Sequence, residues 1–268
     1  MRSGFAFTSS LLFLFIACAP VTRVPITNRK QRLSFTESDM MSMSYTNYSA
    51  FLQTSPPLKA TDPQVVLVRK VGVKIQKAVE DFMKEKGLSD RITGYAWEFN
   101  VVDVKDVNAW CMPGGKVVVY TGLLPVTSDE NGLAVVMGHE IAHAIARHGN
   151  ERMSQQYRSQ NVGNTIGVLV GENKSLGGEL FKNTYNLGAG LTLLKYSRTH
   201  ETEADKLGVV FMAMAGYDPE ESTKFWERMA ANGSGGGNMQ MLSTHPSDEK
   251  RIAELKKFMP TAKQYYKK

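Results

Sequence analysis

Apolar residues recur at helical spacing along most of the chain. One stripe begins after Asp62 and Pro63, a capping residue followed by a first-turn proline, and it ends at Gly87. Its members are Val68, Val71, Ile75, Val79 and Phe82. An earlier stripe follows the capping sequence 36–39 and ends before Pro56. Both stripes predict amphipathic helices that bury one face in a core.

Two short segments have the composition of strands rather than of helices. Residues 95–103 and 116–120 are rich in β-branched and aromatic side chains, and a turn at residues 113–115 separates them. Downstream of the strands, helices are predicted over residues 128–148, about 151–170, 185–215, 218–231 and 246–258. The sequence therefore predicts a mostly helical α+β protein with a small β-sheet.

The first residues have the pattern of a secretory signal. A basic residue precedes a short apolar run over 11–17, and Cys18 follows a small residue, as in lipid-modified bacterial proteins. We expect a signal peptide over 1–17, a lipidated tether with a short helix over 18–60, and one folded domain over 61–268. In this interpretation the chain is anchored to a membrane at Cys18 and does not span it.

The composition excludes several classes of protein. The 268 residues include 32 Lys and Arg against 26 Asp and Glu, and 42% of all residues are hydrophobic. Such a chain can bury a sizeable core, so it is neither disordered nor a small domain that depends on disulfides. The net charge of +6 is spread along the chain without a run of five basic residues. Nucleic acid is therefore not an expected partner.

The sequence His139-Glu140-x-x-His143 is an HExxH motif on a predicted helix that Ser128 or Asp129 can cap. On a helix the two histidines lie about 40° apart, so both rings can reach one metal ion with Glu140 beside them. Apolar residues on the far side can hold this helix in the core: Leu133, Met137, Ile141 and Ile145. The motif predicts a metal site, and zinc is the metal that this pattern usually binds.

A catalytic zinc site needs a third protein ligand and an open fourth position. In one class of HExxH protease the third ligand would be a histidine six residues after the second, but Gly149 occupies that position. His148 lies about 140° from His143 around a continuous helix, so we do not expect His148 to join the site. The third ligand must then come from another helix.

An acidic segment near residue 200 can supply the third ligand. Glu201 and Asp205 are four residues apart and share a helical face, so one carboxylate can bind the metal while the other steadies a ligand histidine. Glu203 points about 200° away from Glu201 on the same helix. Only one of these two glutamates can therefore serve as a ligand.

The combination of motifs resembles peptidase family M48. Its paired signatures are matched by the HExxH motif and by Ser197-Arg198-x-x-Glu201-x-x-Ala204-Asp205. Segments 108–124 and 244–252 also resemble family motifs, in which Pro-Gly-Gly, Gly-Leu-Leu and Thr-His-Pro-Ser stand out. The resemblance covers about residues 61–258, and the chain is most similar to the lipoprotein members of the bacterial periplasm.

The resemblance implies a zincin-type metallopeptidase domain, with a small sheet beside the HExxH helix and one zinc ion per chain. The zinc ligands that it implies are His139, His143 and Glu201. It implies Glu140 as the general base, which would take a proton from water and pass it to the leaving amine. Asp205 and Arg198 are expected to contact and orient the ligand side chains without binding the metal themselves.

His245 belongs to one of the matching motifs, and two roles stay open for it. As a hydrogen-bond donor to the transition state, His245 would aid catalysis. As a fourth zinc ligand, it would displace water and hold the enzyme latent. A loop histidine without either role is the third interpretation.

Substrate binding is expected near the second predicted strand. If Val117, Val118 and Val119 lie on a free sheet edge, they can pair with an extended peptide through the backbone, with Asn108 nearby. The alternative is that this strand is internal and has no free edge.

The function predicted from these features is zinc-dependent hydrolysis of peptide bonds in unfolded or misassembled proteins of the cell envelope. We expect the chain to lie on the periplasmic side of the cell envelope, anchored through Cys18. Because Ala19 follows the cysteine, we expect the anchor to be in the outer rather than the inner membrane. A chaperone-like factor that binds such clients and rarely cleaves them is the second hypothesis. A zinc hydrolase that acts on a small amide is the third.

Overall fold

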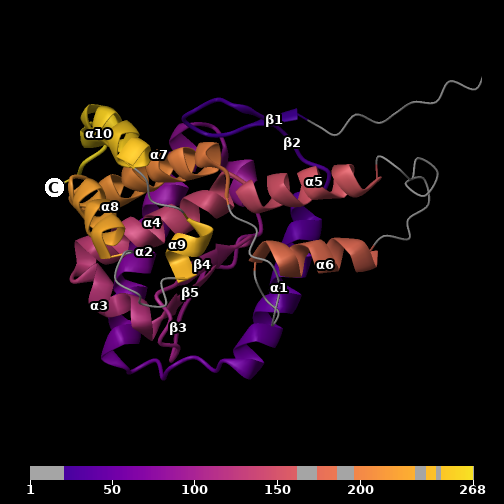
Figure 1. Cartoon of the computed structure of the whole chain (residues 1–268), viewed down its shortest axis with the longest axis horizontal. Coiled ribbons are helices and arrows are strands. Elements are labelled where there is room, and N and C mark those ends of the chain that lie inside the picture. Colours follow the sequence, from indigo (N-terminus) through magenta and orange to yellow (C-terminus); the bar gives the residue numbers. More distant parts are fainter. Residues whose placement is uncertain (1–20, 162–173, 186–195, 233–239, 246–248, 268) are drawn as a thin grey trace, which may run out of the picture.

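Helices make up most of the structure, and a small sheet lies among them (Figure 1). The computed structural model describes residues 21–161, 174–185, 196–232, 240–245 and 249–267. The strands are β1 (Val21–Arg23), β2 (Lys30–Arg32), β3 (Glu98–Val102), β4 (Ala109–Met112) and β5 (Lys116–Tyr120). The helices before β3 are α1 (Glu37–Thr54) and α2 (Pro63–Glu85). The later helices are α3 (Leu124–Thr127), α4 (Glu130–Ile145), α5 (His148–Asn161), α6 (Lys174–Tyr185), α7 (Arg198–Met214), α8 (Glu221–Asn232), α9 (Gln240–Thr244) and α10 (Glu249–Lys263). The predicted mostly helical α+β architecture is confirmed.

The helix starts that were predicted from capping residues are confirmed. The hydroxyl of Thr36 accepts a hydrogen bond from the Asp39 backbone N–H, and the Asp39 carboxylate accepts one from the Thr36 N–H, which completes a capping box at α1. Asp62 caps α2, and Pro63 occupies its first turn. The apolar stripe of α2 is buried, because this face packs against α4 and β3.

The three-stranded sheet has the order β3-β5-β4, so β5 is its central strand. β5 pairs in parallel with β3 and antiparallel with β4. The expectation that Val117, Val118 and Val119 offer a free edge to a substrate is therefore wrong. A strand with partners on both sides has no unpaired backbone to offer, and the three side chains are also buried. The sequence analysis missed β4, the edge strand that lies against α4.

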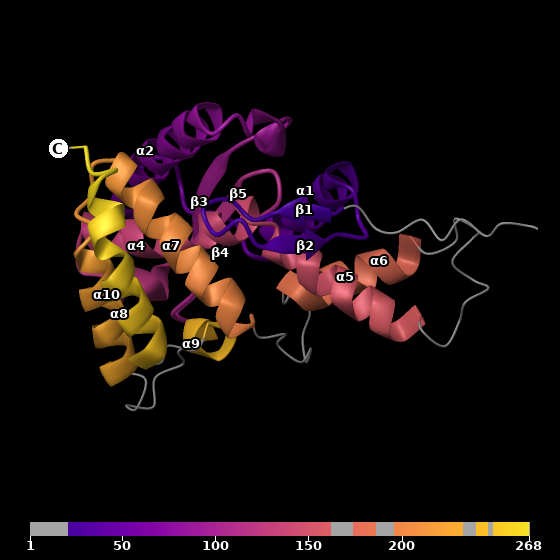
Figure 2. The same cartoon turned by 90° about the horizontal axis from the view of Figure 1, so that it is seen from above.

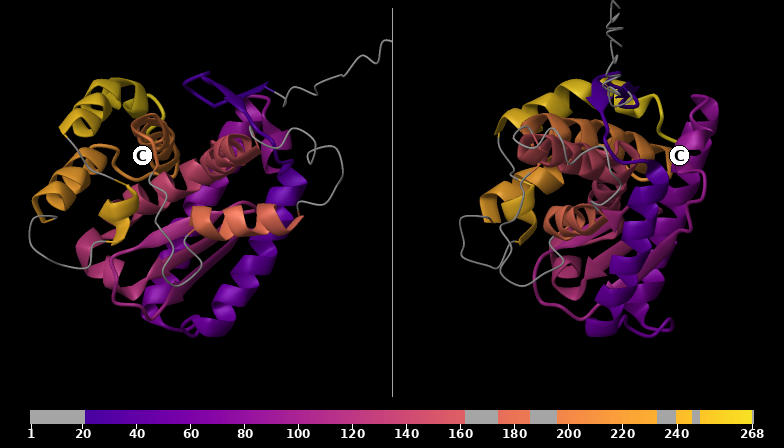
Figure 3. Two further views of the ribbon diagram at one scale, coloured as in Figure 1. Left: turned by 45° about the vertical axis from the view of Figure 1, so that its right-hand side comes forward. Right: turned by 90° about the vertical axis from the view of Figure 1, so that its right-hand side faces the viewer.

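The segment that was expected to be a polar tether begins with a β-hairpin instead. β1 and β2 pair antiparallel, and Figure 3 shows the hairpin folded back over the helices. Val24 and Gln31 are each 1% exposed, so the hairpin is anchored in the domain. Each strand has only three residues, which is too short for alternation of polar and apolar positions to reveal it.

Helices α4 and α7 cross at close range and form the centre of the molecule. A Cβ atom at Gly138 of α4 would lie 2.9 Å from the carbonyl oxygen of Gly208 in α7, so the two glycines permit the approach. Figure 2 shows α8 and α10 on one side of this pair, and α1, α5 and α6 at the other end of the molecule. The crossing brings the HExxH helix against the acidic segment of α7.

Two further expectations concern the membrane and the cysteines. Among the helices that the structure describes, none has the length and apolar composition needed to cross a bilayer. Cys18, the proposed lipidation site, lies outside the described residues. Cys111 is a buried free thiol in the core.

Candidate metal centre

The HExxH residues lie in the second half of α4, which is buried along nearly its whole length. Asp129, one of the two predicted caps, accepts a hydrogen bond from the Gly132 backbone N–H at the start of this helix. The helix ends at Ile145, before the predicted end at residue 148, because Arg147 adopts a left-handed conformation with φ of 60°. The chain then turns sharply into α5.

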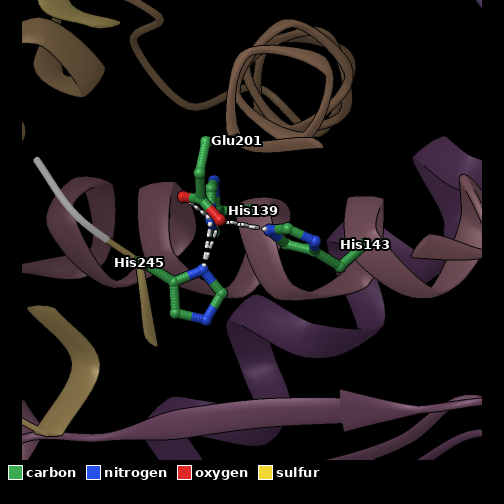
Figure 4. A group of neighbouring side chains, drawn as sticks. All are labelled: His139, His143, Glu201 and His245. Carbon is green, nitrogen blue, oxygen red and sulfur yellow. Dashed lines mark hydrogen bonds and ion pairs between the residues drawn. The ribbon is translucent and has the colours of Figure 1, made fainter. Parts of the chain in front are cut away.

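Four side chains from three segments converge on one point (Figure 4). His139 and His143 reach it from α4, with their Nε2 atoms 3.1 Å apart. Glu201 of α7 places Oε1 3.4 Å from His143 Nε2. His245, directly after α9, places Nδ1 3.2 Å from His139 Nε2 and 3.0 Å from Glu201 Oε1. All four residues are buried.

The spacing of these atoms is close to, and at most 0.3 Å shorter than, the spacing around a tetrahedral metal ion. Ligand atoms that lie 2.0–2.2 Å from zinc at tetrahedral angles are about 3.3–3.6 Å from one another. The distances here run from 3.0 to 3.4 Å. Imidazole nitrogen and carboxylate oxygen are also the donor types that zinc selects. The arrangement therefore suits a zinc ion with three histidines and one glutamate, or with two histidines, the glutamate and an open position.

Glu140 lies beside this group and is not one of its members. Its Oε1 atom is buried and has no hydrogen-bond partner among the described residues, and it lies 3.6 Å from His245 Nε2. Burial raises the pKa of Glu140 to about 7, despite the opposing effect of His245. A carboxylate with such a pKa can both take and release a proton near neutral pH.

The other nitrogen of His139 has a carboxylate partner. His139 Nδ1 lies 3.0 Å from Oδ1 of Asp205. An ionised carboxylate has no proton to donate, so Asp205 accepts a hydrogen bond from the ring N–H. Arg251 donates to both oxygens of Asp205 and lies 2.9 Å from Glu201 Oε2. Asp205 therefore contacts a predicted ligand histidine without being one of the metal-binding residues, as expected.

Arg251 is a functional residue to which the sequence analysis assigned no role. Its guanidinium lies 3.8 Å from the centre of the Trp226 ring, and it is buried between α7 and α10. Burial would raise the pKa of Glu201, but His245 and Arg251 hold that pKa well below its usual range. Glu201 is therefore ionised, as a metal ligand must be. The sequence signal was the place of Arg251 in the segment 244–252, which resembles a family motif.

As expected, His148 is not among the converging metal-binding side chains, but it lies closer to them than a continuous helix would place it. His148 Nδ1 lies 3.0 Å from His143 Nδ1, because the helix ends between the two residues and angles around a continuous helix do not apply. His148 Nε2 lies 3.1 Å from Glu203 Oε2. All five histidines of the chain therefore lie in one buried region: His139, His143, His148, His200 and His245.

Arg198 and Asn108 were also predicted as site residues. Arg198 starts α7 and lines a cavity of about 420 Å³, together with Glu201 and Lys250. Asn108 immediately precedes β4, where its side-chain oxygen accepts a hydrogen bond from the Ala109 N–H. Neither residue is among the group of converging metal-binding side chains.

Known proteins that are similar to this chain include metalloendopeptidases and a further protease. The mitochondrial metalloendopeptidase OMA1 of Schizosaccharomyces pombe is 36% identical over 189 residues, which are 70% of this chain and 53% of that protein. OMA1 of Saccharomyces cerevisiae is 34% identical over 231 residues, 83% of this chain and 64% of that protein. The beta-barrel assembly-enhancing protease of Escherichia coli is 27% identical over 60% of this chain and 34% of its own length. The chain thus spans about half the length of the relatives that it matches.

These relatives correct the expected location. A lipid-anchored protein of the bacterial periplasm was predicted from the segment that ends at Cys18. Relatives that are 28–37% identical to this chain are instead mitochondrial proteins of yeasts, a plant and animals. The prediction of a periplasmic location is therefore wrong, and the lipoprotein subtype is not confirmed.

The resemblance that the motifs indicated is borne out at the level of the family. Residues 71–259, which carry the sheet, the HExxH helix and the acidic segment of α7, match peptidase family M48. This range agrees with a zincin-type metallopeptidase domain and with the metal-binding group of side chains. The chain belongs to peptidase family M48.

Proposed function

We propose that this chain is a zinc-dependent endopeptidase that hydrolyses peptide bonds in unfolded or misassembled proteins. The observation that carries the proposal is the convergence of metal-binding atoms beside a buried carboxylate oxygen of Glu140 that has no hydrogen-bond partner in the described part of the chain. The metalloendopeptidases among the relatives support the same reaction class.

In the proposed reaction, each residue has one task. His139, His143 and Glu201 hold the zinc ion, which supplies Lewis-acid chemistry by polarising the scissile carbonyl and acidifying a water molecule. Glu140 accepts a proton from the attacking water and delivers it to the leaving amine. Its burial keeps the carboxylate close to the reacting atoms and away from bulk water.

An extended substrate would pair with β4, the edge strand beside α4, rather than with the central strand β5. Backbone pairing tolerates many side chains, which suits a protease that acts on unfolded segments. The edge-pairing proposal predicts that N-methylation of alternate amides in a peptide substrate abolishes cleavage. Unchanged cleavage of all the methylated peptides contradicts edge pairing but not the hydrolytic reaction.

The position of His245 favours a second candidate function. Its Nδ1 atom is within 3.2 Å of both His139 Nε2 and Glu201 Oε1, where it can take the fourth place around zinc instead of water. A chain held in this state would bind unfolded clients and rarely cleave them. The His245→Ala variant separates the two roles, because faster cleavage supports the latch and slower cleavage supports a transition-state donor.

The proposed function is tested with casein as an unfolded substrate and one equivalent of zinc. The parent chain should cleave it, while the Glu140→Gln variant should bind the same amount of zinc and leave casein intact. Cleavage by both proteins contradicts the role of Glu140. If neither cleaves although both bind zinc, and His245→Ala cleaves casein, the latched client-binding function replaces the endopeptidase; if His245→Ala is also inactive, neither function is supported.

A further inference from the structure

A buried chain of hydrogen bonds leads from His143 to the N-terminal hairpin. His143 Nδ1 lies 3.0 Å from His148 Nδ1, and His148 Nε2 lies 3.1 Å from Glu203 Oε2. The three residues are 2%, 0% and 3% exposed, respectively. Water therefore has little access to these groups, and each depends on the others for its hydrogen bonds.

The direction of every bond in this chain follows from the chemistry of the groups. A neutral imidazole has one N–H donor and one acceptor nitrogen, and an ionised carboxylate only accepts. If Nε2 of His143 binds zinc, the proton of that ring is on Nδ1 and is donated to His148 Nδ1. His148 must then carry its own proton on Nε2, where Glu203 accepts it. Only one arrangement of protons satisfies all three groups.

The hairpin formed by β1 and β2 holds Glu203, which is the far end of this series of hydrogen bonds. The Arg29 guanidinium donates to both oxygens of Glu203 at 2.9 Å, and the Thr27 hydroxyl donates to Oε1 at 2.6 Å. Arg29 also donates to both oxygens of Glu151, each at 2.7 Å. One arginine therefore bridges two carboxylates and ties the hairpin to α5 and α7.

The same pattern supports the other ligand histidine. The Nδ1 atom of His139 faces Asp205, and Arg251 holds Asp205 from behind. In both cases a carboxylate fixed by arginine determines which ring nitrogen faces the metal, which is how such partners raise the affinity of a histidine ligand. For His143, one additional ring stands between the ligand and the carboxylate.

We propose that His148 is a positioning residue for the metal site, which fixes the tautomer and ring orientation of His143, and that Arg29 secures it through Glu203. This inference rests on the proposed function, because it requires His143 to hold the metal. The inference gives the hairpin a role in metal binding, although the hairpin belongs neither to the HExxH motif nor to the acidic segment of α7.

The test measures zinc affinity by competition with a chromophoric chelator, and the visible absorption of the cobalt-loaded protein. The His148→Phe variant keeps the volume of the ring but cannot accept the bond from His143. It should bind zinc about 10–100-fold more weakly, the usual loss when the partner of a ligand histidine is removed. Its cobalt spectrum should also differ from that of the parent.

His200→Phe is the matched control. His200 stacks on His148 with ring centres 4.5 Å apart and is equally inaccessible, but its Nε2 contacts Glu151 and no metal-binding residue. This variant should lose stability in the metal-free state without losing zinc affinity. Equal losses of affinity in both variants would mean that His148 is merely structural, and would overturn the proposal.

Arg29→Gln provides a second test that leaves both rings in place. It should weaken zinc binding, although less than His148→Phe does, whereas Arg23→Gln on the same hairpin should not. Among the described residues, the Arg23 side chain donates only to the Asn28 carbonyl, and it does so at the surface. Parent-like affinity in both His148→Phe and Arg29→Gln refutes the positioning role and leaves the proposed function intact. Absence of zinc binding by the parent refutes both.

Discussion

Replacing Gly208 by alanine would force apart the two helices that carry the metal-binding residues. A Cβ atom at position 208 would lie 2.8 Å from the backbone nitrogen of His139 and 2.9 Å from the carbonyl carbon of Gly138. Both are backbone atoms of α4, so no side-chain rotation can relieve the contact. Since ordinary contacts begin at 3.4 Å, α4 and α7 must separate by about 0.6 Å.

Two opposing effects set the expected change in stability. Overpacking of a core costs about 1–3 kcal/mol, whereas alanine in place of glycine favours a helix by about 1 kcal/mol. The free energy of unfolding of the metal-free chain should therefore fall by about 0–2 kcal/mol. The effect on metal binding should be larger, because His139 and Glu201 lie on different helices and a metal site tolerates displacements of only about 0.2 Å.

The assay is urea unfolding of the metal-free protein, followed by measurement of zinc affinity. Gly178→Ala is the matched control, because Gly178 lies inside α6 and an added Cβ would have no atom within 4 Å. The control should gain up to about 1 kcal/mol of stability and keep its zinc affinity. The reasoning is refuted if Gly208→Ala is as stable as the control and binds zinc as tightly as the parent.

Three further outcomes are expected in unfolding experiments. Zinc at 100 times its Kd should stabilise the parent and Glu140→Gln by about 2.7 kcal/mol, but not His143→Ala; equal stabilisation of all three contradicts the ligand assignment. The pKa of Glu203 is about 2 against an ordinary value of 4.5, so its contribution to stability is complete above about pH 4.5 and is lost as the pH falls towards 2. Glu203→Gln should show a shallower decline of stability over that range, and an identical decline would show that Glu203 is not responsible. Asp62→Ala should lower the free energy of unfolding by about 1 kcal/mol, because it removes the cap of α2. Asp81→Ala, on the exposed face of the same helix, should lower it by less than half as much. Similar losses in the two variants would contradict the capping argument.

The sequence predicted the parts of the site that depend on one helix at a time. The HExxH spacing indicated that His139 and His143 share a face, and the acidic segment indicated the same for Glu201 and Asp205. Both inferences use only the 3.6-residue period, which is a property of the chain itself. The same reasoning correctly left His148 out of the ligand group, but it did not predict the contact of His148 with His143, because the helix ends early, at Ile145.

Residues that act across elements could not be recognised in this way. Arg29 lies in a segment of ordinary composition, and Arg251 lies in a segment that resembles a family motif, but neither segment shows which carboxylates these arginines contact. The sequence likewise offered two roles for His245, and the orientation of its Nδ1 atom towards Glu201 came from the structure. These features depend on contacts between residues more than 40 positions apart in the chain.

The sequence by itself determined the helices α1, α2, α4, α7, α8 and α10 in outline, the caps of α1 and α2, the buried stripe of α2 and the motif that predicts the metal, but not α6 or α9. These follow from local spacing, since propensity, capping and amphipathicity act within a few turns of the chain. Only the tertiary structure decided that β5 is the central strand, that the N-terminal segment folds back as a hairpin, and that α4 and α7 meet at Gly138 and Gly208. The physical reason is that strand order and helix crossings are set by which distant surfaces exclude water together, and no local pattern records that choice.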